Sequence, residues 1–207
     1  MALSTTTDNP LQISYIEGRT SVLSSTVLSP HIVECTDAFD QYEIGRVFND
    51  AERFDWAEAT ISEKVVYLKN TRSGIRKGLI PDTKNEWLYS KISILINTLN
   101  NICVQQDWTG FLETIQFARY DVGDHYDIHF DGFKETGRKL SMSVQLSDPE
   151  DYEGGLLKIG LPNNPVTVTT EQGSVACFPS WMPHTIEPVT EGTRYSLVAW
   201  GHGPAVR

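Results

Sequence analysis

The sequence has few cysteines, no long apolar run and a shortage of basic residues, and each shortage excludes a class of protein. Its three cysteines, Cys35, Cys103 and Cys177, are widely spaced and form neither a disulfide framework nor a C-x-x-C metal site, which favours an intracellular setting. No apolar run approaches the length of a membrane span, and the amino-terminal segment has no basic residue before Arg19. These absences predict a soluble, cytoplasmic protein with no membrane partner.

Basic residues are in the minority, with 17 Lys and Arg against 27 Asp and Glu and a formal net charge of −10. Such a surface repels phosphate backbones, so no nucleic-acid partner is expected. The chain of 207 residues, 40% of them hydrophobic, is long enough to bury a core without disulfides, and its apolar content excludes global disorder. Length and composition together predict one globular domain.

The hydrophobic pattern divides the chain into an amino-terminal extension, a helical support and a strand-rich core. Residues 1–30 are rich in Ser and Thr and are predicted to be a loosely held tail with one short strand near 12–15. A strand over 31–39 and a capped helix over 40–49 are expected next. Apolar residues spaced by three and four over 84–102 predict an amphipathic helix that packs and carries no chemistry.

After Gly110, short runs of alternating apolar and polar residues are separated by Gly and Pro. These runs predict strands over residues 113–121, 125–130, 138–146, 156–160, 165–169, 174–178, 184–188 and 193–200. Helices followed by so many short strands are typical of a mainly β sandwich or barrel with helices packed on one face. We predict a single domain over 31–207, with helical support at 31–109 and the catalytic core at 110–203.

His129 and Asp131 form an H-x-D pair at the end of a predicted strand, where positions i and i+2 face the same side. His184 begins a later strand and is expected to complete the set from across the barrel. Two imidazoles and one carboxylate on one face of an octahedral metal leave its other face open, which is the facial triad of non-haem Fe(II) oxygenases. Because an H-x-D pair alone is a weak signal, a histidine satisfied by hydrogen bonds is the alternative for His129.

Polar residues on nearby strands strengthen this interpretation. Arg194 and Ser196 share one face of the strand predicted over 193–200, and a guanidinium inside a barrel needs an anionic partner. The planar fork of Arg194 suits a carboxylate in bidentate geometry, and the Ser196 hydroxyl is placed to add a hydrogen bond. Tyr120, nine residues before His129, lies on the strand that leads into the metal site, where a phenol reaches the same ligand.

Three segments carry a resemblance to a known family: ARYDVGDHYDIHFDGF at 118–133, KLSMSVQLSDPEDYEGGLLKI at 139–159 and GSVACFPSWMPHTIEPVTEGTRYSLVAWG at 173–201. Together they resemble the 2-oxoglutarate- and Fe(II)-dependent dioxygenases of the prolyl 4-hydroxylase group, in particular the PKHD-type hydroxylases. The resemblance covers roughly the carboxy-terminal half of the chain. It implies a double-stranded β-helix, the jelly-roll or cupin-like fold, for the core.

The resemblance also assigns roles to individual residues. It implies that the iron ligands are His129, Asp131 and His184, and that the distal carboxylate of 2-oxoglutarate binds Arg194. Where some members have a second tyrosine at the co-substrate, this chain has Gln145. The residues expected to bind the co-substrate are therefore Arg194, Ser196, Tyr120 and Gln145, and Trp200 is expected close to the substrate.

The implied reaction is hydroxylation of an unactivated C–H bond, with conversion of 2-oxoglutarate to succinate and CO2. The cofactors are Fe(II), 2-oxoglutarate and O2, with ascorbate as an additional reductant. The expected substrate is a prolyl residue in a protein or peptide, and the first alternative is a free amino acid or another small metabolite. The second alternative is a cupin-like protein that holds metal without turnover, although such a protein needs neither Arg194 nor Ser196.

Other candidates have a functional and a structural interpretation. Four basic residues form either a mobile flap that steers the substrate or an exposed, charged loop or hairpin: Lys69, Arg72, Arg76 and Lys77. Trp181 either lines the substrate mouth or packs. We expect His125 to stay off the metal, the acidic run 148–153 to be a solvated turn, and Cys177 to be a buried hydrophobe.

Overall fold

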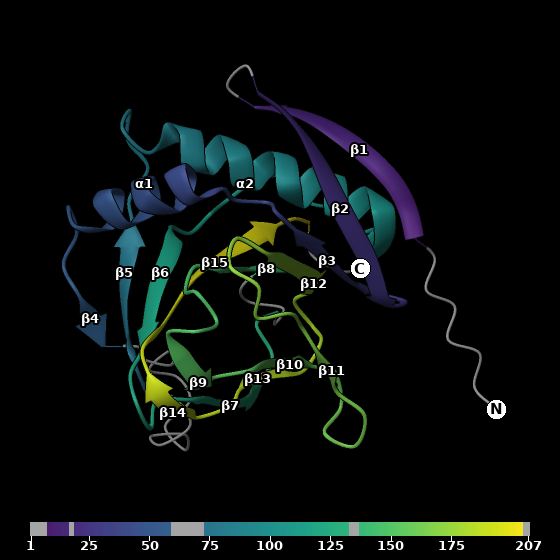
Figure 1. The fold of residues 1–207 in the computed structure, drawn as a ribbon. Helices are drawn as coiled ribbons and strands as arrows, with labels where there is room; N and C mark the ends of the chain where they lie inside the picture. The colour runs from purple at the N-terminus through teal and green to yellow at the C-terminus, as the bar shows by residue number, and fades with distance from the viewer. Residues whose placement is uncertain (1–7, 17–18, 59–72, 133–136, 205–207) are drawn as a thin grey trace.

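The computed structural model describes residues 8–16, 19–58, 73–132 and 137–204 (Figure 1). Its helices are α1 (Gln41–Ala51) and α2 (Glu86–Leu99), and α2 continues into a π-helical turn, η1 (Asn100–Val104). Its strands are β1 (Asp8–Ile16), β2 (Arg19–Ser29), β3 (Ile32–Thr36), β4 (Ala57–Glu58), β5 (Ile75–Leu79), β6 (Ile115–Tyr120), β7 (Tyr126–His129), β8 (Arg138–Gln145), β9 (Tyr152–Gly154), β10 (Leu157–Ile159), β11 (Val166–Thr167), β12 (Val175–Pro179), β13 (His184–Ile186), β14 (Val189–Gly192) and β15 (Arg194–His202).

The described strands pair antiparallel into two facing sheets and a small ribbon. The major sheet runs β1-β2-β3-β12-β8-β15-β6-β5-β4, the minor sheet runs β11-β10-β13-β7, and β14 pairs with β9. Helices α1 and α2 cover the outer face of the major sheet, and the minor sheet lies on its other side (Figure 1). This arrangement confirms the predicted mainly β jelly-roll core with helices on one face. All eight strands predicted after Gly110 are present, with ends that differ by a few residues.

Alternation along the central strands sorts side chains between two cores. Val144 on β8 and Leu197 on β15 belong to the cluster that packs under the helices. Their neighbours Gln145 and Ser196, which are paired in register, point to the opposite face, between the two sheets. The inner face is therefore where the polar residues of the chemistry collect.

Helix α1 begins at the predicted cap. The Asp40 side chain accepts a hydrogen bond from the Glu43 backbone N–H at 2.8 Å, and the Glu43 carboxylate accepts one from the Asp40 N–H at 3.0 Å. This reciprocal capping box satisfies two N–H groups that the helix itself leaves without partners. The long amphipathic helix is also confirmed, since Leu88, Ile92 and Leu95 of α2 are fully buried.

The loosely held tail predicted for residues 1–30 is wrong for its described part. Strands β1 and β2 pair with each other, and β2 pairs with β3 at the edge of the major sheet. The short strand expected near 12–15 lies within β1, whereas the pattern missed β2, because an edge hairpin is held by backbone hydrogen bonds and needs no regular apolar face. Strand β3 lies within the strand expected over 31–39, whereas β4 and β5, between the two helices, were not predicted.

The described part of the basic segment fits the hairpin alternative, since β5 pairs antiparallel with β4, but it is not exposed throughout. Lys69 and Arg72 lie outside the described residues, whereas Arg76 and Lys77 are on β5, paired with β6. Lys77 is buried on the helix side, where its ammonium donates to the Ala51 carbonyl at 2.9 Å and lies 4.4 Å from the centre of the Trp56 ring. A satisfied buried charge of this kind has no local signature, because its partner lies far away in sequence.

The acidic run 148–153 is a turn only in its first part, since Tyr152 begins β9 and is buried. Cys177 is buried as predicted, and burial raises the pKa of its thiol to about 12, which keeps it protonated and unreactive. Among the described helices, none combines the length and apolar character that a bilayer crossing needs.

Candidate metal centre and co-substrate pocket

The two predicted histidine ligands are cross-strand partners in the minor sheet. His129 ends β7 and His184 begins β13, and the two residues are directly opposite each other in the antiparallel register. Their ring centres are 4.1 Å apart. His184 therefore comes from the neighbouring strand, and the prediction that it reaches the metal from across the barrel is wrong. Antiparallel pairing itself brings the two rings to one side.

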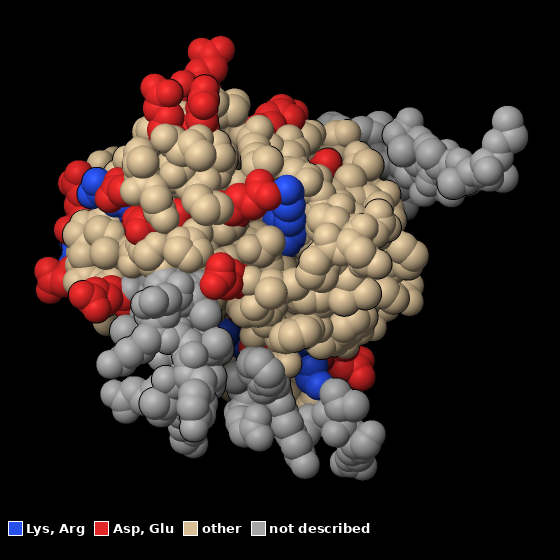
Figure 2. All heavy atoms as spheres, turned by 90° about the horizontal axis from the view of Figure 1, so that it is seen from below, with Lys and Arg blue, Asp and Glu red and all other residues tan. Residues whose placement is uncertain are grey.

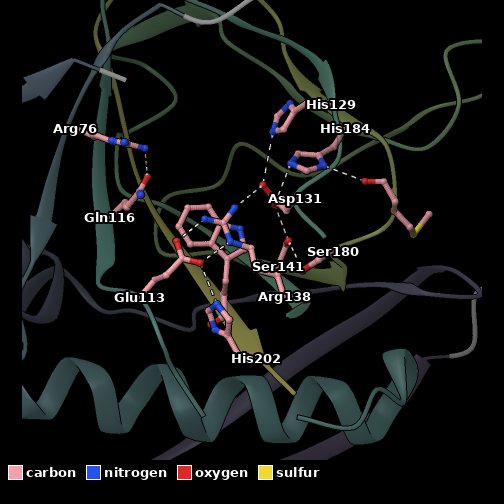
Figure 3. A network of polar contacts seen from close by, with 12 residues as sticks. Arg76, Glu113, Gln116, His129, Asp131, Arg138, Ser141, Ser180, His184 and His202 are labelled. Atoms are coloured by element: carbon pink, nitrogen blue, oxygen red, sulfur yellow. Dashed lines mark hydrogen bonds and ion pairs between the residues drawn. The ribbon is translucent and has the colours of Figure 1, made fainter. Parts of the chain in front are cut away.

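Asp131 lies just beyond the end of β7, and backbone contacts hold it beside the histidines (Figure 3). The backbone N–H groups of Asp131 and Gly132 donate to the Ser180 carbonyl at 3.0 and 2.7 Å. One carboxylate oxygen, Oδ1, is 3.8 Å from Nε2 of His129, and the other, Oδ2, is 3.3 Å from Nε2 of His184. The three side chains thus converge on one point.

Backbone carbonyls fix which nitrogen of each histidine faces that point. Nδ1 of His129 is 2.8 Å from the Asp127 carbonyl, and Nδ1 of His184 is 3.0 Å from the Met182 carbonyl. Since a carbonyl only accepts, each Nδ1 donates to its carbonyl, and Nε2 is the nitrogen left to bind a metal. Both Nε2 atoms face Asp131.

Asp131 is held in its charged form. Burial alone would raise the pKa of this carboxyl, but the neighbouring His184 and His129 and the hydrogen bond from Ser141 hold it well below its usual range. The Ser141 hydroxyl donates to Oδ2 at 2.6 Å, and Ser180 lies 2.9 Å from that hydroxyl. The carboxylate is therefore both ionised and fixed in orientation at neutral pH.

These donors fit a divalent metal ion. One ligand atom from each of His129, Asp131 and His184 lies within 4.8 Å of the others. Metal bonds of about 2.1 Å at right angles place neighbouring ligand atoms about 3 Å apart, close to the 3.3 Å between His184 and Asp131. Two imidazoles and a carboxylate on one side suit Fe(II) with open positions. The triad is a candidate iron site.

Ser141→Ala is expected to weaken metal binding about tenfold, because outer partners of metal ligands contribute about 10–100-fold in affinity. A Mn(II) titration of the purified protein measures this. Ser143→Ala is the matched control, since Ser143 is on the inner face of the same strand but lines the cavity of Arg194 instead. Equal metal affinity for Ser141→Ala and the wild type would show that the serine does not orient Asp131.

A second polar group lies behind the triad. Arg138 is 3.7 Å from Oδ1 of Asp131, and its guanidinium forms a bidentate pair with Glu113 (Figure 3). Nε2 of His202 also contacts Glu113, at 3.0 Å. Burial would raise the pKa of Glu113, but Arg138 and then His202 outweigh it and hold the pKa below its usual value. This network places a fixed positive charge beside the metal ligand.

Trp200 is on the inner face of β15, and the guanidinium of Arg138 lies 3.7 Å from the centre of its ring. The side chain is 6% exposed, yet its indole N–H has no hydrogen-bond partner within the described part of the chain. A buried donor without a partner costs free energy, so an acceptor is expected from outside the described residues.

Arg194 lines a cavity between the two sheets. The side chain is 3% exposed, and no carboxylate among the described residues lies within ion-pair distance of it. Its one hydrogen bond is a long contact of 3.4 Å to the Ser196 hydroxyl. The same cavity is lined by Gln145, Tyr152 and Ser143. A buried guanidinium without a counter-ion fits an anion that binds in this cavity.

Gly155 leaves the space that Arg194 occupies. Its φ of +59° is the left-handed region, and a Cβ atom added there would lie 2.9 Å from Cδ of Arg194. The arginine side chain therefore approaches the backbone closely at Gly155.

The structure places the remaining predicted residues as follows. Tyr120 is buried on β6 directly opposite Arg194, whose guanidinium carbon is 5.8 Å from the centre of the tyrosine ring. Trp181 is half exposed and packs edge-on against His31. Arg76 points to the inner face, where it donates to Gln116 at 3.3 Å (Figure 3). His125 contacts Ser73 and is not among the grouped ligands.

Sequence reasoning missed the polar partners that support the site. No motif marks Ser141, Arg138, Glu113 or Tyr152, and each acts through another side chain, as Glu113 does through Arg138. One signal was available for Ser141, because it lies on the inner side of the predicted strand that follows the H-x-D pair. Tyr152 was missed because it lies within the acidic run 148–153, which was predicted to be a solvated turn.

Comparisons with known proteins agree with this geometry. Residues 115–202 match the family model of the 2OG-Fe(II) oxygenase superfamily. A PKHD-type hydroxylase of Crocosphaera subtropica is 34% identical over 44% of this chain and 43% of its own length. Another, of Prochlorococcus marinus, is 30% identical over 62% of this chain and 60% of its own length. The matches thus span about half the length of these relatives, and they confirm the resemblance predicted from the sequence.

Solved structures share the fold. A prolyl hydroxylase of Trichoplax adhaerens, in complex with a peptide fragment of the hypoxia inducible factor oxygen degradation domain, has a TM-score of 0.69 at 18% identity and covers 84% of both chains. A prolyl-4-hydroxylase of Pseudomonas putida has a TM-score of 0.62 at 20% identity and covers 86% of this chain and 95% of its own.

Proposed function

We propose that this protein is a prolyl hydroxylase. The proposal starts from the match of residues 115–202 to the 2OG-Fe(II) oxygenase superfamily. Its substrate is a prolyl residue in a protein or peptide. The single observation that carries the oxygenase function is a buried Arg194 with no counter-ion among the described residues, in a chain that also groups His129, Asp131 and His184. A protein that merely holds metal has no use for such a charge, which is costly until an anion binds.

When bound, Fe(II) with 2-oxoglutarate and O2 supplies the oxidising chemistry, in which one oxygen atom enters succinate as CO2 leaves and the other hydroxylates the C–H bond. The residues of this chain bind and orient. His129, Asp131 and His184 hold the metal from one side, and their backbone and serine partners keep each donor atom directed at it. Arg194 binds the far carboxylate of 2-oxoglutarate, and Ser196 adds a hydroxyl.

The substrate is proposed to bind against the inner face of β15 and β5. The unpartnered N–H of Trp200 donates to an acceptor of the bound molecules, and Arg76 and Trp181 are candidate contacts for a peptide. The peptide complex of the Trichoplax protein supports a polypeptide substrate. Seen from below in Figure 2, the described surface carries more Asp and Glu than Lys and Arg, which does not favour nucleic acid.

Anaerobic addition of 2-oxoglutarate to the Fe(II)-loaded protein is expected to produce a visible charge-transfer absorption, because the C1 carboxylate and the keto oxygen chelate the metal. Absence of the band at saturating Fe(II) would remove the co-substrate assignment. Succinate release is then measured with proline-rich peptides and with free amino acids. Release with peptides supports the prolyl substrate, whereas release with free amino acids alone favours the small-metabolite alternative.

A further inference from the structure

The cavity of Arg194 contains a second donor that nothing in the described chain uses. Tyr152 is 7% exposed and lines this cavity together with Gln145 and Arg194. Its phenol oxygen is 2.8 Å from Nε2 of Gln145. Which of the two groups donates in this contact decides whether the phenol proton is still available.

The orientation of the Gln145 amide answers this question. The atom that contacts the phenol also lies 3.4 Å from the backbone carbonyl oxygen of Ser147. A carbonyl oxygen only accepts, so the atom between it and Tyr152 is the amide nitrogen. Gln145 therefore donates to the phenol oxygen, and the phenol proton remains free. No acceptor for that proton occurs among the residues that the structure describes.

Tyr152 and Arg194 flank the same glycine. A Cβ atom added to Gly155 would lie 2.9 Å from Cδ of Arg194 and 3.6 Å from Cε2 of Tyr152. Tyr152 is also paired with Gly192 between β9 and β14, two residues before Arg194. The ring and the guanidinium are thus held on adjoining elements. The other charged residue that lines the cavity, Glu34, accepts a hydrogen bond from the Thr169 backbone N–H at 3.0 Å.

We propose that Tyr152 donates a hydrogen bond to the same carboxylate that Arg194 binds, and that Gln145 is a positioning residue that presents its phenol. This inference rests on the proposed function, in which that carboxylate is the distal one of 2-oxoglutarate. The site then offers the anion a guanidinium, a phenol and the Ser196 hydroxyl. Gln145 is paired with Ser196 across β8 and β15, and it acts on the anion through the phenol of Tyr152.

Tyr152→Phe tests the proposal in the Mn(II)-loaded protein, with binding followed by the water-proton relaxation of the metal. The variant is expected to bind 2-oxoglutarate about tenfold or more weakly, the effect typical of a hydrogen bond to a charged group. Mn(II) affinity is expected to stay the same. Affinity for 2-oxobutyrate, which has the same chelating end and no distal carboxylate, is also expected to stay the same.

Two further variants separate positioning from packing. Gln145→Leu is expected to weaken 2-oxoglutarate binding in the wild type and to have no further effect in Tyr152→Phe. Tyr195→Phe is the matched control, because Tyr195 is on the opposite face of β15 and packs against Phe48 and Phe117. It is expected to bind 2-oxoglutarate as the wild type does.

The outcomes distinguish this inference from the proposed function. Unchanged 2-oxoglutarate affinity in Tyr152→Phe, with tight binding in the wild type, overturns the role of Tyr152 and leaves the oxygenase function intact. Equal losses for 2-oxoglutarate and 2-oxobutyrate also overturn it, because they indicate a packing defect. A wild-type protein that binds Mn(II) but no 2-oxoglutarate overturns the proposed function itself.

Discussion

Asp131→Ala is expected to lower metal affinity by more than about a hundredfold and to abolish succinate production. The residue supplies the only carboxylate in the ligand group, and loss of a ligand exceeds the 10–100-fold effect of losing an outer partner. Two imidazoles alone neither neutralise the charge of the metal nor hold it on one face. A Mn(II) titration and a succinate assay of the same preparation measure both effects.

The alanine variant also removes the carboxylate that accepts from the Ser141 hydroxyl and leaves that hydroxyl with Ser180 alone, which lowers stability as well. Asp131→Asn avoids this, because its amide oxygen still accepts from Ser141 while the charge is lost. Asp127→Ala is the control, since that carboxylate is on β7, four residues before Asp131, and is mostly exposed. Retention of tight Mn(II) binding in a folded Asp131→Asn variant would remove Asp131 from the metal site.

The ligand triad could be predicted because its members have local signatures. The H-x-D pair puts two donors on one side within three residues, and the third histidine begins a recognisable strand. What the sequence does not contain is the pairing of strands. The register that places His129 opposite His184 is set by the whole minor sheet, so the pattern predicted the ligands and misplaced one of their strands.

The same limit explains the other errors. Strand β5 contains Lys77, which is buried because the carbonyl of Ala51 and the ring of Trp56 receive its ammonium. A sequence pattern scores lysine as exposed, so the segment resembled a loop. Tyr152 was missed for a similar reason. A single aromatic residue among acidic ones creates no hydrophobic periodicity, and its burial depends on the pairing of β9 with β14. The division at residue 110 and the single domain over 31–207 stay predictions, although β3 and β5 share the major sheet with the core.

Arg194→Gln is expected to weaken 2-oxoglutarate binding by about a hundredfold and to leave Mn(II) affinity unchanged. Truncating one member of a buried, hydrogen-bonded charge pair costs about 2–5 kcal/mol, and each 1.4 kcal/mol is a factor of ten. The arginine contacts no metal ligand, so metal binding has no reason to respond. Arg119→Gln on β6 is the control, since that guanidinium is partly exposed and pairs with Asp121.

The free energy of unfolding distinguishes an arginine that binds an anion from an arginine that supports the fold. Without co-substrate, Arg194 is a buried charge with no counter-ion among the described residues, so Arg194→Gln is expected to leave the free energy of unfolding unchanged or to increase it. In the Mn(II)-loaded wild type, 2-oxoglutarate at 100 times its Kd is expected to add about 2.7 kcal/mol. The variant at the same concentration is expected to gain almost nothing. A large loss of stability in the variant without co-substrate would show instead that Arg194 supports the fold. A residue whose role is to bind an anion destabilises the protein until the anion is bound.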